Sequence, residues 1–335
     1  MAHETRTADE VATQLRMDEA YAAWLTDLDA AGPPEEPVAL PKRDDALALL
    51  GRLGVPAAHA AEALTAAPSP EATPELWWLL ERCVNLLHRE MGGFDSMRPW
   101  PALPSALGVH SRYFYPWVYV ATLPATRRWH TVRGIPDDVS WATLADLGLH
   151  MSIRERMYGE GGLNEQTWLH LHFRGAIYAL GRLQFNRSRI RYDAEMIEST
   201  AGTFRPGDAS LGVHIPETGP LSAEACDASF ARVRGFFDRH FPEDHVTIAT
   251  CGSWLLDEQL AEYLPADSNI VRFQQRFQRV PGSRIADDAI LRFVFRSVSP
   301  SLDALPQRTT LERAVVSHLR AGKHWYSRSG WVELP

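Results

Sequence analysis

Residues 209–237 predict a strand, a glycine turn and a helix in direct succession, and this unit constrains the fold of the chain around it. Apolar residues take every second position at its start, which is the period of a strand: Leu211, Val213 and Ile215. Pro216 ends the predicted strand, and the run Thr218-Gly219-Pro220 is typical of a turn.

The turn leads into a predicted helix. Ser222 is a good N-cap, and Glu224 in the first turn complements the helix dipole. Apolar side chains then recur on one helical face: Cys226, Phe230, Val233 and Phe237. The free N–H groups at a helix N-terminus favour anions, so the turn is a candidate anion site; the alternative is an ordinary strand–helix connection.

The composition limits the class of protein. A length of 335 residues is typical of two domains, and 45% hydrophobic with 23% charged residues is ordinary for a globular protein. The net charge of −8 argues against a nucleic-acid partner, and no run of apolar residues predicts a membrane span. The first residues lack a signal-peptide pattern, and the three cysteines are an odd number, so we expect reduced thiols and a cytoplasmic protein.

Helical patterns dominate residues 1–163, which we predict to form a helical N-terminal domain. The predicted helices cover residues 8–31, 44–53 and 57–66, a segment from Pro74 to the glycines at 92 and 93, and residues 140–156 with Ser140 as the cap. Residues 99–141 are rich in aromatic side chains and proline. We expect most of these rings in the core between helices; the alternative is a ligand groove.

Residues 164–335 mix strand and helix patterns, which makes the fold class α+β. Strands are predicted at residues 168–173, 176–185, 209–215, 246–254 and 290–295, and helices at 223–237, 269–277 and 310–319. The first two strands would form a hairpin. We therefore predict a second domain with a mixed sheet flanked by helices.

The order of these elements resembles the Gcn5-related N-acetyltransferase superfamily. The resemblance is carried by Ala179-Leu-Gly-Arg-Leu-Gln-Phe185, by Leu211-Gly-Val-His-Ile-Pro216 with residues 219–237, and by Cys251-Gly-Ser-Trp-Leu-Leu256. The whole chain is similar to two-domain bacterial acyltransferases that have a helical N-terminal domain and an N-acetyltransferase-like C-terminal domain.

The resemblance implies acyl-CoA as a co-substrate, because in that superfamily the turn after the central strand binds the pyrophosphate of coenzyme A. The binding residues it implies are Val213, Ile215, Thr218, Gly219, Leu221, Ser222 and Ala223. Here the turn keeps one glycine, Pro220 has no N–H to offer, and Glu217 would repel phosphate unless it points away. An acyl group on a carrier protein is therefore an alternative donor.

The superfamily also often uses a tyrosine, in the helix after the next strand, to protonate the leaving thiolate. Phe273 stands where that tyrosine is expected, and it has no proton to give. Another acid, or water, must then protonate the thiolate.

Acyl transfer to an amine needs a base, donors for the oxyanion and an acid for the thiolate. His214, two residues before the turn, is our first candidate for the base or for a substrate orienter; the alternative is a structural strand histidine. His170 and His172, on one face of the predicted strand 168–173, are the second candidates for the base. The resemblance implies that backbone N–H groups of residues 213–215 meet the oxyanion.

Ser253 and Cys251 share one face of the predicted strand 246–254. Ser253 is a candidate proton donor to the thiolate. Cys251 is a candidate nucleophile that is transiently acylated, or alternatively a small buried hydrophobic residue. We expect Cys226 to be structural.

Two further patterns have alternative interpretations. His170 and His172, with His214 as a third ligand, would suit a metal ion, but no cysteine or carboxylate completes a recognisable spacing and we expect no metal. A basic run consists of Arg182, Arg187, Arg189 and Arg191. It is either a solvated edge or a contact for phosphates or an acidic carrier protein.

The sequence therefore predicts an acyl-CoA-dependent N-acyltransferase. It would move an acyl group from acyl-CoA, or from an acyl carrier protein, to an amine on a small molecule or a peptide. One alternative is a catalytically inactive module that binds acyl-CoA or an acyl carrier. The other is a histidine-ligated metalloenzyme.

Overall fold

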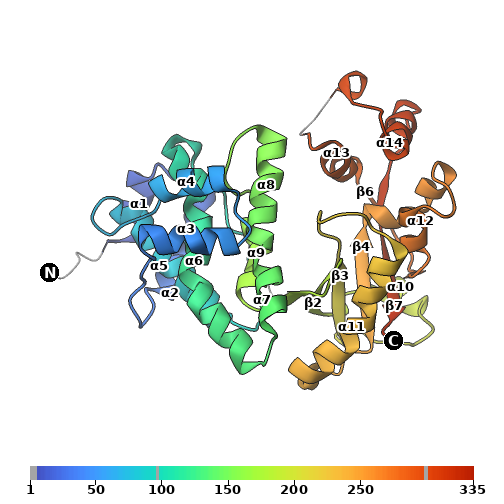
Figure 1. The fold of residues 1–335 in the computed structure, drawn as a ribbon, viewed down its shortest axis with the longest axis horizontal. Coiled ribbons are helices and arrows are strands. Elements are labelled where there is room, and N and C mark those ends of the chain that lie inside the picture. The colour runs from blue at the N-terminus through green and yellow to red at the C-terminus, as the bar shows by residue number, and fades with distance from the viewer. Residues whose placement is uncertain (1–5, 96–97, 298–300) are drawn as a thin grey trace. The chain divides into compact units, whose positions relative to one another are not determined.

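The computed structural model describes residues 6–95, 98–297 and 301–335. The chain forms two compact units, Met1–Ala176 and Ile177–Pro335 (Figure 1). The sequence prediction placed the division between residues 163 and 164. That position lies ahead of a helix, Gln166–Phe173, whose contacts assign it to the first unit.

The first unit is built from helices. They are α1 Ala8–Gln14, α2 Ala22–Ala31, α3 Arg43–Arg52, α4 Ala57–Thr65, α5 Pro74–Arg89, α6 Val109–Val132, α7 Asp137–Leu144, α8 Asp146–Tyr158 and α9 Gln166–Phe173. Of the helices in the described ranges, none has the length and apolar character of a transmembrane segment.

Two predicted helices of this unit are divided in the structure. Residues 8–31 form α1 and α2, with Arg16 between them in the left-handed region at φ 55°. Residues 140–156 fall into α7 and α8, so the prediction that Ser140 caps a helix was wrong. Ser140 is buried inside α7, and its hydroxyl lies 2.6 Å from Nδ1 of His130.

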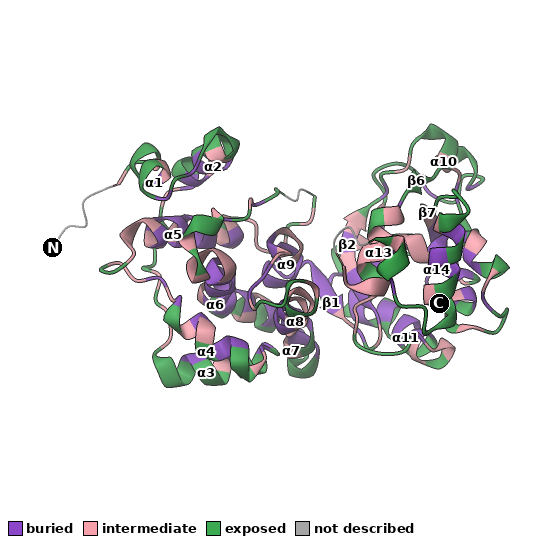
Figure 2. Cartoon of the chain, turned by 90° about the horizontal axis from the view of Figure 1, so that it is seen from above, coloured by how far each residue is buried: buried purple, intermediate pink, exposed green. Residues whose placement is uncertain are grey.

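The long helix α6 carries most of the predicted aromatic cluster into the core (Figure 2). Five of its rings are at most 2% exposed: Tyr113, Phe114, Tyr115, Trp117 and Tyr119. The core interpretation is therefore confirmed for these residues. They supply the large apolar area that holds a bundle of short helices together.

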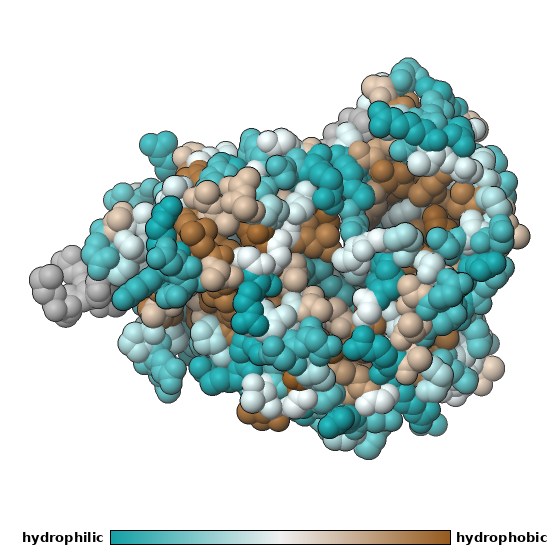
Figure 3. All heavy atoms as spheres, in the orientation of Figure 1, coloured by the Kyte–Doolittle hydropathy of each residue, from teal (hydrophilic) through white to brown (hydrophobic). Residues whose placement is uncertain are grey.

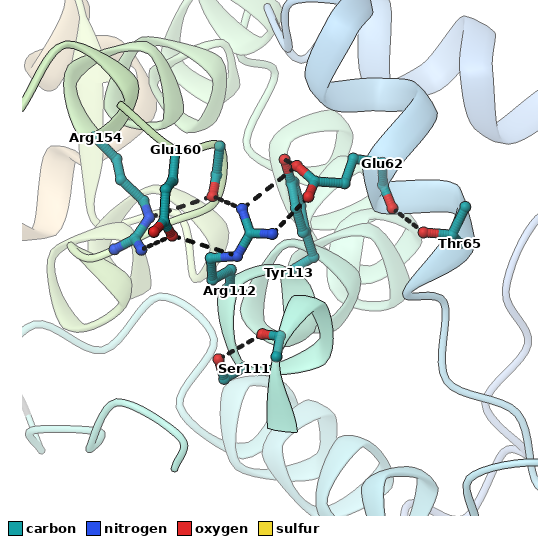
Figure 4. Close-up of polar contacts among 9 residues, drawn as sticks. Glu62, Thr65, Ser111, Arg112, Tyr113, Arg154 and Glu160 are labelled. Atoms are coloured by element: carbon teal, nitrogen blue, oxygen red, sulfur yellow. Dashed lines mark hydrogen bonds and ion pairs between the residues drawn. The ribbon is translucent and has the colours of Figure 1, made fainter. Parts of the chain in front are cut away.

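A polar network fastens the connection between α8 and α9 to α4 and α6 (Figure 4). Arg112 donates to the carbonyl of Gly161 at 2.8 Å and pairs with Glu62 at 2.5 Å. The hydroxyl of Tyr113 donates to the same carboxylate at 2.6 Å. A Cβ at Gly161 would lie 2.1 Å from that hydroxyl oxygen, so the close approach requires glycine.

Residues 168–173 are part of α9, so the predicted strand there was wrong. His170 and His172 are 1% and 0% exposed, and the His170 ring packs 4.0 Å from that of Trp100. A helix buried on all sides has no polar face and therefore shows no helical period. For this reason the alternation of apolar residues and histidines in residues 168–173 matched the period of a strand.

The second unit is built around a mixed sheet (Figure 1). Its strands are β1 Ile177–Ala179, β2 Gln184–Arg189, β3 Ala209–His214, β4 Ile248–Ser253, β5 Gln278–Arg279, β6 Arg284–Ile285 and β7 Tyr326–Glu333. The order is β1-β2-β3-β4-β7-β5, and β6 also pairs with β7. The pair β3–β4 is parallel and the others are antiparallel. The helical first unit and this mixed sheet confirm the predicted α+β class.

Helices flank the sheet. They are α10 Ala194–Glu198, α11 Ala223–His240, α12 Asn269–Gln274, α13 Asp287–Phe295 and α14 Thr310–Arg320. The predicted apolar stripe of α11 is buried. Its Phe230 packs 5.5 Å from Phe185 on β2, and its Phe236 packs 5.1 Å from Tyr178 on β1. This stripe fixes α11 against one face of the sheet.

Two predicted strands of this unit differ from the structure, and a long strand was missed. Residues 176–185 are not one strand, because Gly181, at φ 92°, turns the chain between β1 and β2, and these two strands form the hairpin. Residues 290–295 belong to α13 rather than to a strand. The strand β7 was not predicted, although it pairs with β4, β5 and β6.

Candidate active site

The two parallel strands at the centre of the sheet separate before they end. β3 pairs with β4 at Leu211 with Ala249 and at Gly212 with Thr250. The ladder of the two strands ends at these positions, although β3 continues to His214 and β4 to Ser253. We infer that the strands separate there and that residues 213–215 turn one edge of their backbone toward the gap. The gap offers peptide N–H and C=O groups to an extended ligand.

A pocket of about 510 Å³ lies at this end of the strands. Its apolar wall includes Ile215, Leu221, Trp254, Leu255, Leu264 and Leu311. Figure 3 shows apolar residues gathered around a hollow in the second unit. Arg182 and Arg296 also line the pocket, so it combines an apolar wall with two cations.

Three of the predicted donor-site residues line this pocket: Ile215, Gly219 and Leu221. Val213 precedes them on β3, and Thr218 lies exposed in the turn. Ser222 caps α11 by accepting a hydrogen bond from the N–H of Ala225 at 3.2 Å, so the predicted N-cap is confirmed. Ala223 is the first residue of this helix, where N–H groups have no intrahelical acceptor.

The guanidinium of Arg182 donates hydrogen bonds to three backbone carbonyl groups of the turn between β3 and α11. Its Nη1 donates to Pro216 at 2.8 Å, its Nη2 to Gly219 at 3.0 Å and its Nε to Pro220 at 3.0 Å. Sequence analysis placed Arg182 in a stretch that carries the family resemblance and in a basic run that could contact phosphates, but it did not predict a contact with this turn. The long separation in sequence between Arg182 and the turn leaves no local signal for this contact.

The predicted repulsion between Glu217 and phosphate is reduced by an ion pair. Oε2 of Glu217 lies 2.6 Å from Nη2 of Arg296, and the two side chains are 18% and 31% exposed. The pair neutralises the carboxylate at the pocket. Arg296 was not singled out from the sequence.

His214 is held by a neighbouring strand. Its Nε2 lies 2.6 Å from Oδ1 of Asn186 on β2, and the Nδ2 of Asn186 donates to the carbonyl of Arg187 at 2.8 Å. Gly212, directly opposite Asn186, leaves the space for this contact. Asn186 and Gly212 were not predicted as site residues.

Ser253 lies on the other face of the sheet from His214. Gly212 and Thr250 are paired, so His214 shares their face while Ser253, three residues after Thr250, faces the opposite side. The hydroxyl of Ser253 accepts from the N–H of Leu255 at 3.1 Å. The proton of the Ser253 hydroxyl is not used in this hydrogen bond.

Cys251 is buried, and burial raises the pKa of its thiol to about 12. The thiol is therefore neutral at physiological pH and a poor nucleophile. This favours the alternative of a small buried hydrophobic residue. Cys226 is likewise buried, on the apolar stripe of α11.

His170 and His172 belong to the buried core of the first unit. Burial lowers the pKa of His170 to about 3, so its ring is neutral. Nε2 of His172 lies 3.1 Å from Oδ2 of Asp146. Because the two histidines do not alternate along a strand, the geometry on which the metal hypothesis depended is absent. In the described ranges, no three His, Cys, Asp or Glu side chains converge as metal ligands would.

The remaining arginines of the basic run do not form one surface. Arg187 is buried, and its Nη2 lies 3.0 Å from Oδ1 of Asp244. The guanidinium of Arg189 donates to the carbonyl of Gly207 at 3.3 Å, and Arg191 is exposed. Phe273, at the position of the family tyrosine, is fully buried.

The split parallel strands, the turn before α11 and the adjoining pocket define an acyltransferase of the N-acetyltransferase type. Two family models match the chain. The GNAT-like C-terminal domain matches residues 177–332, and the N-acyltransferase N-terminal domain matches residues 44–175. No curated protein matched.

Solved structures of acyltransferases resemble the whole chain. One, in complex with decanoyl-CoA and teicoplanin, is 45% identical, covers 98% of this chain and 100% of its own, and has a TM-score of 0.91. Another, with decanoyl-CoA, is 47% identical with the same coverage and TM-score. A mutant acyltransferase with octanoyl-CoA is 45% identical. The chain belongs to this family of two-domain N-acyltransferases, and it is an enzyme that uses acyl-CoA as a co-substrate.

Proposed function

We propose that this enzyme transfers a medium-length acyl group from acyl-CoA to an amine of a glycopeptide acceptor of the teicoplanin type. The observation that carries this proposal is the similarity along the entire chain to acyltransferases solved with octanoyl-CoA, decanoyl-CoA and teicoplanin. A role in the biosynthesis of acylated glycopeptides in the bacterial cytoplasm fits these substrates.

The donor is proposed to bind in the pocket beside the split strands. The pantetheine arm would run along the backbone of residues 213–215, and the pyrophosphate would lie at the turn held by Arg182. N–H groups of Leu221 and Ala223, at the start of α11, are the proposed phosphate donors. Arg182 and Arg296 are already engaged with the turn, so we favour coenzyme A over an acidic carrier protein as the acyl carrier.

The chemistry is proposed to use both faces of the sheet. The amine nitrogen attacks the thioester carbon, and the C–S bond breaks. His214, on one face, takes the proton that the amine loses. Ser253, on the opposite face, donates a hydrogen bond from its hydroxyl to the leaving thiolate, and water supplies the proton that converts the thiolate to the free thiol. N–H groups of residues 213–215 stabilise the oxyanion between the two faces.

A direct assay tests the proposed substrates. The purified enzyme is mixed with decanoyl-CoA and deacylated teicoplanin, and mass spectrometry follows the acceptor while a thiol reagent follows free coenzyme A. We expect both products in equal amounts. Release of free coenzyme A without any acylated acceptor would mean that the enzyme hydrolyses the thioester. Absence of turnover on a panel of amines would overturn the proposal.

A parallel assay tests the choice of carrier. Decanoyl-CoA and a decanoyl acyl carrier protein are compared at equal concentration. We expect faster transfer from the CoA thioester. Faster transfer from the carrier protein would reverse the assignment of the donor and leave the proposed acceptor intact.

A further inference from the structure

The amide of Asn186 holds the imidazole of His214 from the adjacent strand. We propose that Asn186 is a positioning residue that fixes the orientation and tautomer of His214, and that Gly212 is required to make room for it. This proposal rests on the proposed role of His214 as the base.

The orientation of the Asn186 amide is set by its second hydrogen bond. Nδ2 of Asn186 donates to the carbonyl of Arg187 at 2.8 Å, so Oδ1 is the atom that faces His214. A flipped amide would place Oδ1 against that carbonyl, with two acceptors in contact. The amide therefore has one favourable orientation.

The tautomer of His214 follows from this orientation. Oδ1 can only accept, so Nε2 of the ring must carry a proton to donate across the 2.6 Å contact. The lone pair of the neutral ring then lies on Nδ1. When Nδ1 takes a proton, Nε2 still donates to Asn186, so the contact survives the change of charge. A base held in this way needs no reorientation during the reaction.

The space for this contact depends on a missing side chain. Gly212 pairs directly with Asn186 in the β2–β3 register. A Cβ at Gly212 would lie 2.1 Å from Oδ1 of Asn186 and 3.2 Å from Nε2 of His214. Gly212 does not have a positive φ, so this position needs glycine for space and not for its backbone conformation. Any side chain here would displace the amide.

The test compares Asn186→Leu, which keeps the size but loses the acceptor, with Asn186→Asp, which keeps the acceptor. The kcat and the KM for decanoyl-CoA are measured for each. Asn186→Leu is expected to lower kcat by about 10- to 100-fold, as is usual for impaired base catalysis, with little change in KM. Asn186→Asp is expected to restore most of kcat. Equal kcat in the wild type and Asn186→Leu would overturn the proposal.

A spectroscopic measurement separates positioning from a merely structural role. ¹⁵N-histidine NMR reports which ring nitrogen carries the proton, and the His214→Gln spectrum identifies the signals of His214. We expect the Nε2–H tautomer in the wild type and in Asn186→Asp, and exchange between tautomers in Asn186→Leu. An unchanged His214 spectrum in Asn186→Leu would contradict the proposal.

Two controls keep the outcomes distinct. Ser188→Ala changes a polar residue two positions along the same strand and is expected to leave kcat unchanged. His214→Gln tests the base itself. Full activity in His214→Gln would refute the proposed role of His214, whereas an inactive His214→Gln beside an active Asn186→Leu would refute only the inference about Asn186. Gly212→Ala is expected to behave like Asn186→Leu, with circular dichroism confirming that each variant is folded.

Discussion

The guanidinium of Arg182 donates from Nη2 to the carbonyl oxygen of Gly219 at 3.0 Å, in the turn that leads into α11. Because a trans peptide points its N–H opposite to its C=O, carbonyl groups that face Arg182 direct the following N–H groups away from it. Pro220, held in the same way, therefore orients the N–H of Leu221, a residue of the pocket wall. The turn has fewer glycines than the family pattern, but its contacts with Arg182 still give its backbone N–H groups a defined direction.

Removing the hydrogen bonds of Arg182 to the turn is expected to weaken binding of the nucleotide part of acyl-CoA. Arg182→Ala should raise the KM for decanoyl-CoA by about tenfold, which corresponds to about 1.4 kcal/mol. The KM for decanoyl-pantetheine, which lacks the pyrophosphate, should change little. Steady-state kinetics with both donors checks this difference. An equal rise for both would show that Arg182 supports the fold rather than the phosphate site.

The ion pair of Glu217 with Arg296 predicts a compensating double substitution. Arg296→Ala leaves the Glu217 carboxylate without this partner at the pocket, and it should raise the Kd of decanoyl-CoA several-fold through repulsion of phosphate. Adding Glu217→Gln should recover much of the loss. Calorimetric titration of the two single variants and the double variant measures the coupling; strictly additive effects would count against it.

The raised pKa of Cys251 predicts that no acyl-enzyme forms there. With a pKa of about 12, the thiol stays protonated from neutral pH up to about pH 10. Cys251→Ala should keep kcat within about twofold of the wild type, since no step uses the thiol. Iodoacetamide at pH 7.5 should not inactivate the folded enzyme. Mass spectrometry that found an acyl group on Cys251 would refute this.

The depressed pKa of Asp146 predicts that the free energy of unfolding of the first unit falls in acid. Burial alone would raise the pKa of its carboxyl, but the nearby His172 and His150 hold that pKa well below the usual range. Since the folded-state pKa is depressed, the stabilisation is present above about pH 4 and is lost as the pH falls further. Asp146→Asn should therefore lower the free energy of unfolding at pH 7 and flatten its decline in acid. Urea unfolding between pH 3 and 7 checks both expectations, and identical slopes would contradict them.

The sequence was most informative where structure is local. The strand of residues 209–215, the Ser222 cap and the stripe of α11 depend on neighbours in sequence, and the structure confirms them. Residues 168–173 were assigned to the wrong element because most of α9 is buried, which hides its helical period. Residues 290–295 were also assigned wrongly, but there a local signal was missed: Asp287 and Asp288 stand in the first turn of α13, and only Ile290 of residues 290–295 is buried.

In the candidate site, too, the residues with a local sequence signal were predicted and those defined by tertiary contacts were not. His214 could be proposed because it stands just before a recognisable turn. Arg182 was named only as one member of a basic run, and Asn186 was not named. The contacts that these two side chains make could not be predicted, since their partners lie 28 or more residues away in the sequence. Gly212 looked like an ordinary strand residue, and only the cross-strand register shows what its missing side chain permits.

The most direct test of the account is the single-turnover rate of acyl transfer from decanoyl-CoA to deacylated teicoplanin in the wild type and in His214→Gln, measured by rapid quench with the donor bound in advance. The wild type should form acylated acceptor together with free coenzyme A. His214→Gln should bind decanoyl-CoA with unchanged Kd but transfer at least about 100-fold more slowly, the usual contribution of a general base. Equal rates in the two proteins would contradict the assignment of His214 as the base at the split between β3 and β4.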